Sequence, residues 1–168
     1  TPDPDNPYAN RDPRLNASIV VNGSWWNGRE INQASGGSDD MNKNNTSKTG
    51  YYLKKFLADE LNLVQGAQTQ HQWIVFRYAE IFLNYAEAMN EAYGPDALPA
   101  GFTLTAQQAL NQVRRSASTS LSQITTTNKD EFRNAIKHER RIELAFEDHR
   151  FWDLLRWKDA MTVLNQPV

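Results

Sequence analysis

The chain has 168 residues, 39% of them hydrophobic, which suits one domain that buries roughly 70% of the surface of the unfolded chain. Its net charge of -2 argues against nucleic acid as a main partner, because proteins that bind nucleic acids usually carry an excess of basic residues. The chain has no cysteine and no run of about 18 apolar residues, which excludes disulfides and thiolate metal sites and predicts no membrane-spanning helix.

Residues 1–71 are predicted to be rich in loops, with short strands. Residues 1–14 are proline-rich and have no apolar periodicity, so we expect an extended entry segment. Residues 15–22 form a β-branched run that ends at an Asn-Gly turn signal and are predicted to be a strand. Residues 50–57 alternate in a way that favours a second strand paired with the first, although a short helix fits them too. The segment 32–49 between them is predicted to be a long polar loop.

Residues 72–168 are predicted to form two antiparallel helix pairs, because apolar residues recur there at helical spacing. Gly94 ends the first helix, Thr105 is the N-cap of the second, and Asn128 or Asp130 is the N-cap of the third. We expect the helices at about residues 78–93, 106–117, 130–147 and 151–164. A bend at Glu147-Asp148-His149 separates the last two, and the length of each pair is in the range of tetratricopeptide-like repeats.

One stretch of the helical part, residues 136–157, interleaves charged and apolar side chains: IKHERRIELAFEDHRFWDLLRW. Charges that approach a packed face persist only when they are paired with opposite charges. We therefore predict that ion pairs hold the helices together. The expected members of this staple are Arg77, Glu80, Glu87, Arg140, Arg141, Glu143 and Glu147.

The same residues offer little for catalysis. Arginine neighbours keep carboxyl groups ionised, which is unsuitable for the protonated acid of a glycosidase. His138-Glu139 lacks the second histidine of a zinc motif, since the required position is Ile142. No phosphate-binding glycine loop or nucleophile elbow is present. We expect no catalytic residue, no metal site and no cofactor.

The other candidate site is formed by Trp25, Trp26, Asn27 and Arg29. Indole faces stack on sugar rings, while Asn and Arg side chains supply hydrogen bonds to hydroxyl groups. Loops that present such groups from a rigid scaffold are common binding sites. The structural alternative is that one tryptophan covers the top of the core and the other packs the loop.

Three helical segments together resemble the C-terminal region of the SusD/RagB family: FRYAEIFLNYAEAMNEA, ALNQVRRSA and ERRIELAFEDHRFWDLLRW. DPRLNASIV and TGYYLKKF are also similar to family segments, so the resemblance covers residues 12–157. It implies a mainly α fold of tetratricopeptide-like antiparallel helix pairs (an α-α superhelix) with a long irregular N-terminal segment and a small β hairpin. It also implies that residues 1–168 are a single domain, the C-terminal part of a SusD-like protein. The signal peptide and the lipid-bearing cysteine would then belong to a preceding part.

The resemblance further implies non-catalytic binding of an oligosaccharide or polysaccharide at the cell surface. The partner would be a SusC-like TonB-dependent outer-membrane transporter, and membrane association would come only from the lipid anchor. The tryptophan site rests on no family motif. Two other functions stay open: a tetratricopeptide-like scaffold for protein interactions without a small ligand, and, more remotely, an α-helical glycosidase.

Overall fold

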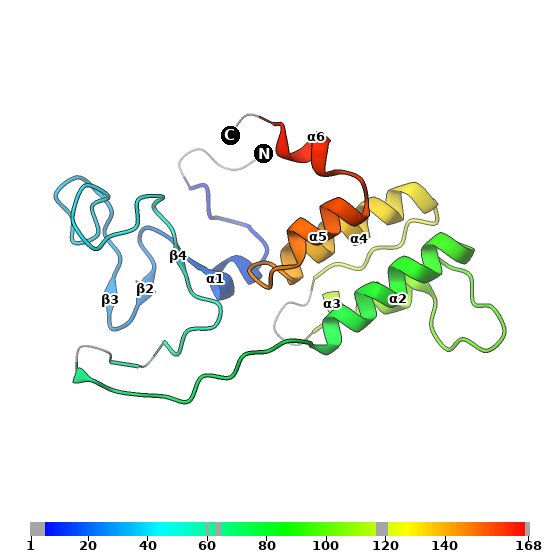
Figure 1. Cartoon of the computed structure of the whole chain (residues 1–168), viewed down its shortest axis with the longest axis horizontal. Helices are drawn as coiled ribbons and strands as arrows, with labels where there is room; N and C mark the ends of the chain where they lie inside the picture. The colour runs from blue at the N-terminus through cyan, green and yellow to red at the C-terminus, as the bar shows by residue number, and fades with distance from the viewer. Residues whose placement is uncertain (1–5, 60, 63–64, 117–120, 167–168) are drawn as a thin grey trace. The chain divides into compact units, whose positions relative to one another are not determined.

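A computed structural model describes residues 6–59, 61–62, 65–116 and 121–166, and the chain is mainly helical (Figure 1). It divides into two compact units, Thr1–Trp73 and Ile74–Val168, and each is described by itself. That residues 1–168 act as one domain stays a prediction.

The first unit carries a short helix and two small antiparallel sheets. Its described elements are α1 (Arg14–Ser18), β1 (Ile19–Val20), β2 (Trp25–Trp26), β3 (Arg29–Glu30) and β4 (Tyr52–Leu53). β1 pairs with β4, which confirms the predicted pairing of the two segments. β2 pairs with β3 around a turn in which Asn27 and Gly28 have φ angles of 50° and 80°. Asn-Gly is the preferred pair for such tight hairpin turns, because both central residues need a positive φ.

The prediction that residues 15–22 form a strand is wrong for its first half, which is helical. Pro13 has a φ of -60°, which suits the start of a helix. The Asp12 carboxylate accepts the N–H of Arg14 at 2.9 Å and the Nε–H of the same residue at 3.0 Å. These local contacts outweigh the β preference of the run, and the strand is limited to Ile19–Val20.

The polar segment 32–49 is a loop, as predicted, and many hydrogen bonds lie within it. Asp40 accepts the backbone N–H groups of Gly36 and Asn42 at 2.7 and 2.9 Å. The Lys48 ammonium donates to the carbonyls of Met41 and Lys43 at 2.6 and 2.7 Å. Turn-forming polar side chains therefore shape this loop without an apolar core of its own.

The second unit contains the longer helices. Its described helices are α2 (Tyr78–Tyr93), α3 (Ala106–Arg114), α4 (Lys129–Glu143), α5 (His149–Arg156) and α6 (Ala160–Leu164). Helix α2 packs against both α3 and α4. The buried core comes from all three and from the turn after α4: Leu83, Ala86, Met89, Ala106, Ala109, Leu110, Val113, Phe132, Ile136 and Leu144. Full burial of a large apolar side chain contributes about 1.5–3 kcal/mol, so this cluster is the main source of stability in the unit.

The helix ends that depend on local chemistry are confirmed. Gly94, with a φ of 94°, follows α2, and its N–H donates to Asn90 at 3.0 Å. Thr105 caps α3 in a capping box with Gln108. Asn128, and not Asp130, is the N-cap of α4, because its Oδ1 accepts the N–H groups of Asp130 and Glu131 at 2.9 and 3.1 Å.

Helix α2 begins at Tyr78, where its predicted helical spacing begins, but three other predicted helix bounds are wrong. Helix α3 ends at Arg114, three residues before its predicted end. Helix α4 ends at Glu143, because Phe146 and Asp148 have φ angles of 65° and 61°, which a right-handed helix cannot accommodate. The predicted last helix is interrupted between α5 and α6, where Lys158 has a φ of 62°. None of the helices in the described part of the chain is long and apolar enough to cross a membrane.

Candidate functional site

The β2–β3 hairpin, residues 25–30, places its two tryptophans in different surroundings; we call it the tryptophan hairpin. Neighbouring side chains of a strand point to opposite faces. The side chain of Trp25 is 73% exposed. Trp26 is half-buried, with its ring 6.0 Å from that of Tyr52 and its Nε1–H donated to Asp59 at 3.1 Å. Trp26 therefore holds the hairpin in place, while the indole face of Trp25 is available to a ligand.

A cavity of about 250 Å³ lies beside the tryptophan hairpin. Both tryptophans line it, together with Asn16, Ile19, Val20, Ser24 and Lys54. The Ser24 Oγ accepts the N–H of Val21 at 3.2 Å, so its own hydroxyl hydrogen can be donated to a ligand. Lys54 Nζ lies 3.2 Å from Asp59 Oδ2 and has further N–H groups to donate. The cavity thus combines an aromatic face with several hydrogen-bonding groups.

Arg29 and Asn27, the other two predicted ligand residues, do not line this cavity. The Arg29 guanidinium makes a two-pronged ion pair with Asp39, with both N–O distances 2.6 Å. Asp39 is only 3% exposed. Hydrogen bonding from Arg29 outweighs burial and holds the pKa of the Asp39 carboxyl well below its usual range. Arg29 therefore fastens the tryptophan hairpin to the loop 32–49, whereas Asn27 is exposed at the tip.

The polar cavity residues that the sequence did not suggest are Asn16, Ser24 and Lys54. They come from three separate segments, and no local sequence pattern connects them. The β1–β4 pairing brings Lys54 beside the first segment, because its N–H donates to the carbonyl of Ser18 at 2.9 Å. The register of the β1–β4 pairing would have been needed to place these residues together.

The predicted ion-pair residues form separate groups in the helical unit. Arg77 binds Glu143 at 2.5 Å and Glu147 at 2.7 Å, and so links the start of α2 to the end of α4 and the following turn. Arg140 pairs with Asp153, a partner that was not predicted, at 2.9 Å, and both side chains are buried.

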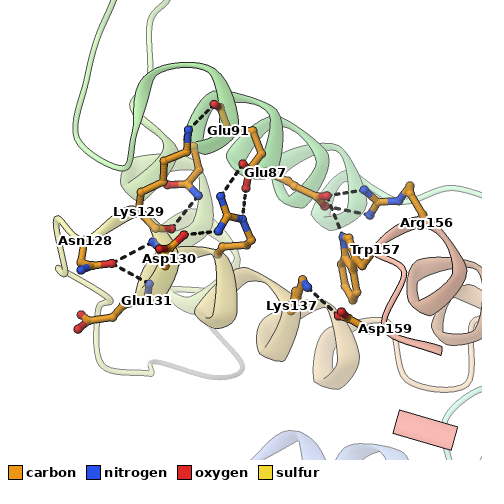
Figure 2. A network of polar contacts seen from close by, with 12 residues as sticks. Glu87, Glu91, Asn128, Lys129, Asp130, Glu131, Lys137, Arg156, Trp157 and Asp159 are labelled. Atoms are coloured by element: carbon orange, nitrogen blue, oxygen red, sulfur yellow. Dashed lines mark hydrogen bonds and ion pairs between the residues drawn. The ribbon is translucent and has the colours of Figure 1, made fainter. Parts of the chain in front are cut away.

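Glu87 on α2 has a third set of partners, Arg156 and Trp157. Arg156 Nη2 and Trp157 Nε1 both donate to its carboxylate at 2.9 Å (Figure 2). Burial favours the protonated acid, but these donors prevail and lower the pKa of Glu87 below its usual range. Glu80, by contrast, lies 3.6 Å from His149 Nε2. Arg141 is exposed and makes no ion pair with the described residues.

These ion pairs and hydrogen bonds suit a structural role better than a role in acid–base catalysis. A general acid at neutral pH needs a raised pKa, and the bonds from Arg156 and Trp157 have the opposite effect on Glu87. Among the described residues, no three His, Asp or Glu side chains are grouped in a way that could hold a metal ion.

Comparisons with family models, related sequences and solved structures all point to the same protein family. The model of the SusD family matches residues 2–168. A solved SusD-like carbohydrate binding protein from Bacteroides fragilis has a TM-score of 0.77 and 32% identity, over 98% of this chain and 32% of that chain. A second SusD-like protein from Bacteroides fragilis has a TM-score of 0.75 and 34% identity, over 91% of this chain and 29% of that chain. SusD-like protein P25 from Formosa agariphila is 38% identical over 94 residues, which are 55% of this chain and 16% of the relative. The chain therefore spans less than a third of the length of these relatives.

Proposed function

The chain belongs to the SusD family, and we propose that it contributes a glycan-binding site to a non-catalytic, carbohydrate-capturing protein. The observation that carries the proposal is the exposed indole of Trp25 at a cavity with polar side chains. The description of one matched structure as a SusD-like carbohydrate binding protein supports the same ligand class.

The cavity is suited to a small part of a glycan. Its volume of about 250 Å³ is just below the range of about 300–1,000 Å³ that is usual for pockets of drug-sized ligands. One or two sugar rings would enter it, and the rest of the chain would run over the surface. The C–H face of a ring would stack on Trp25, and its hydroxyl groups would bond to Ser24 and Lys54.

Binding at this cavity would leave the glycosidic bond intact. Hydrolysis normally requires two carboxyl groups on either side of the bond. Among the described residues that line the cavity, Lys54 is charged and none carries a carboxyl group.

Calorimetry with the intact protein and a panel of plant, host and microbial glycans tests this proposal. Saturable binding is expected, and Trp25→Ala should weaken it by about 1–3 kcal/mol, or roughly 5- to 150-fold in Kd, if the loss resembles that of an aromatic face stacked on a base. Trp73→Ala is the matched control, because Trp73 is also 73% exposed and does not line the cavity.

Two results would change the assignment. The absence of binding across a broad panel would favour a protein-interaction scaffold. New reducing ends that appear on incubation with a glycan, and disappear with Glu143→Gln, would indicate a glycosidase.

From family membership we also propose that the captured glycan passes to a TonB-dependent transporter beside the protein in the outer membrane. A lipid anchor outside these 168 residues would hold the protein at the cell surface. Affinity purification of the intact protein from detergent-solubilised outer membranes should recover the transporter. Recovery of the glycan-binding protein without any barrel partner would contradict this part of the proposal.

A further inference from the structure

A second hollow lies in the helical unit, between α3 and the segment 121–125; we call it the amide pocket. It has a volume of about 280 Å³, similar to that of the cavity beside the tryptophan hairpin. Gln108, Gln112 and Arg115 line it from α3 and its C-cap. Side chains three or four residues apart lie on the same face of a helix, so these three form one polar stripe. The opposite wall includes Gln123 and Thr125.

Hydrogen bonds from α3 to the backbone hold this opposite wall in place. Asn111 Nδ2 donates to the carbonyl of Ile124, and Asn111 Oδ1 accepts the N–H of the same residue, both at 2.9 Å. Gln107 Nε2 donates to the carbonyl of Thr126 at 2.9 Å. Asn111 is only 8% exposed, so its amide serves as a structural link. The amide pocket is therefore shaped before a ligand binds, which lowers the entropic cost of binding.

Three other amides of the pocket keep hydrogen-bonding groups for a ligand. Gln112 and Gln123 are exposed, and their side chains make no hydrogen bond with the described residues. Gln108 Oε1 accepts the N–H of Thr105 at 2.8 Å, which leaves the NH2 group of Gln108 to donate. A side-chain amide both donates and accepts hydrogen bonds, and so does each hydroxyl group of a sugar ring. The amide pocket therefore suits a hydroxylated ring.

Arg115 gives the amide pocket a positive charge. It is exposed and makes no ion pair with the described residues, and none of the described residues that line the pocket carries a carboxyl group. Lys54, beside the tryptophan hairpin, is instead paired with Asp59 at 3.2 Å. A guanidinium can donate two parallel N–H groups to the oxygens of one anionic group. Arg115 therefore favours a ligand that carries a negative charge.

We propose that the amide pocket binds an acidic sugar, with its carboxylate or sulfate group on Arg115 and its hydroxyl groups on the glutamine amides. A small inorganic anion would leave the amides unused, and a neutral sugar would leave the guanidinium without a charged acceptor. The residues that carry the proposal belong to the helical unit, so it does not depend on stacking at Trp25. The chain would then have one site that stacks a sugar ring and a second site that selects for charge.

Calorimetry with matched acidic and neutral probes tests the proposal on the intact protein. One pair is trigalacturonate and its methyl ester, and the other is a sulfated galactan trisaccharide and its desulfated form. At least one acidic probe should bind about 5- to 10-fold more tightly than its neutral form, because a hydrogen bond between charged groups is stronger than one to a neutral acceptor. The pair that shows this preference identifies the anionic group as a carboxylate or a sulfate.

Three variants of the intact protein locate the preference. Arg115→Gln should abolish it, because the substitution removes the charge and keeps an amide. Arg141→Gln is the matched control and should leave it unchanged, since Arg141 is also exposed, makes no ion pair with the described residues and does not line the amide pocket. Trp25→Ala should leave the preference for the acidic probe in place, whatever it does to the binding of neutral glycans.

Four results would overturn the proposal. They are equal or absent binding of the acidic and neutral probes by the unmodified protein, a preference that survives Arg115→Gln, equal losses in Arg115→Gln and Arg141→Gln, and a preference that disappears in Trp25→Ala. The last result would place the acidic sugar at the tryptophan hairpin. Loss of neutral-glycan binding alone would leave the amide pocket supported, so the two sites can fail separately.

Discussion

Removal of the Arg140 side chain should destabilise the helical unit far more than removal of an exposed arginine. Arg140 is 4% exposed and joins three helices, through Asp153 on α5 at 2.9 Å and Asn84 on α2 at 2.6 Å. In Arg140→Ala, the ion-pair partner that the buried Asp153 carboxylate keeps among the described residues is Arg156, at 3.0 Å. Loss of one partner of a buried pair costs about 3–5 kcal/mol. We expect the free energy of unfolding to fall by about that amount.

Urea denaturation followed by circular dichroism measures this difference, with Arg133→Ala as the control. Arg133 binds Glu91 and Asp130 in partly exposed pairs, for which about 0–1 kcal/mol is expected. A double replacement of Arg140 by Met and Asp153 by Leu should recover most of the loss, because apolar side chains often replace a buried pair without cost. Equal losses for the two single variants would refute the role of Arg140 as a buried link between helices.

Three further predictions concern the core, a helix cap and pH. Phe132→Ala, at a fully buried position of α4, should lower the free energy of unfolding by about 3–5 kcal/mol in urea denaturation, and a loss below about 1 kcal/mol would contradict the assigned core. Thr105→Ala should cost about 0.5–2 kcal/mol in the same assay, and Thr105→Ser should restore most of it, because the hydroxyl caps α3. The pKa of Asp39 is lower in the folded chain than in the unfolded one, so its pair with Arg29 stabilises the fold above about pH 4, and this contribution is lost as the pH falls further. Stability measured between pH 7 and pH 2 should therefore fall less steeply in Asp39→Asn, and parallel curves would contradict the pair.

The helical part of the fold was largely predictable, because its signals are local. The threonine, asparagine and glycine at the helix ends act through bonds to backbone groups within four residues. The apolar spacing of α2 and α3 directly indicates the faces that are buried. The errors arose where a single backbone angle determines the end of a helix. Phe146 and Lys158 have positive φ angles there, and no sequence pattern indicated them.

The candidate binding site was predictable only in part, because it depends on contacts between distant segments. The sequence singled out Trp25 by its residue type and its turn. It also suggested Arg29 as a ligand residue, although that side chain binds the buried Asp39, ten residues later. The approach of Lys54 to the cavity depends on the pairing of β1 with β4, and the sequence does not specify that register.

The central claim is that a glycan stacks on Trp25, and fluorine NMR of the intact protein tests it most directly. The protein would be labelled with 5-fluorotryptophan, and the signals of Trp25 and Trp73 would be assigned from Trp25→Phe and Trp73→Phe. On titration with a glycan that binds in calorimetry, we predict a saturable shift of the Trp25 signal at the calorimetric Kd, and no shift of the Trp73 signal. An unchanged Trp25 signal during saturable glycan binding would contradict the account.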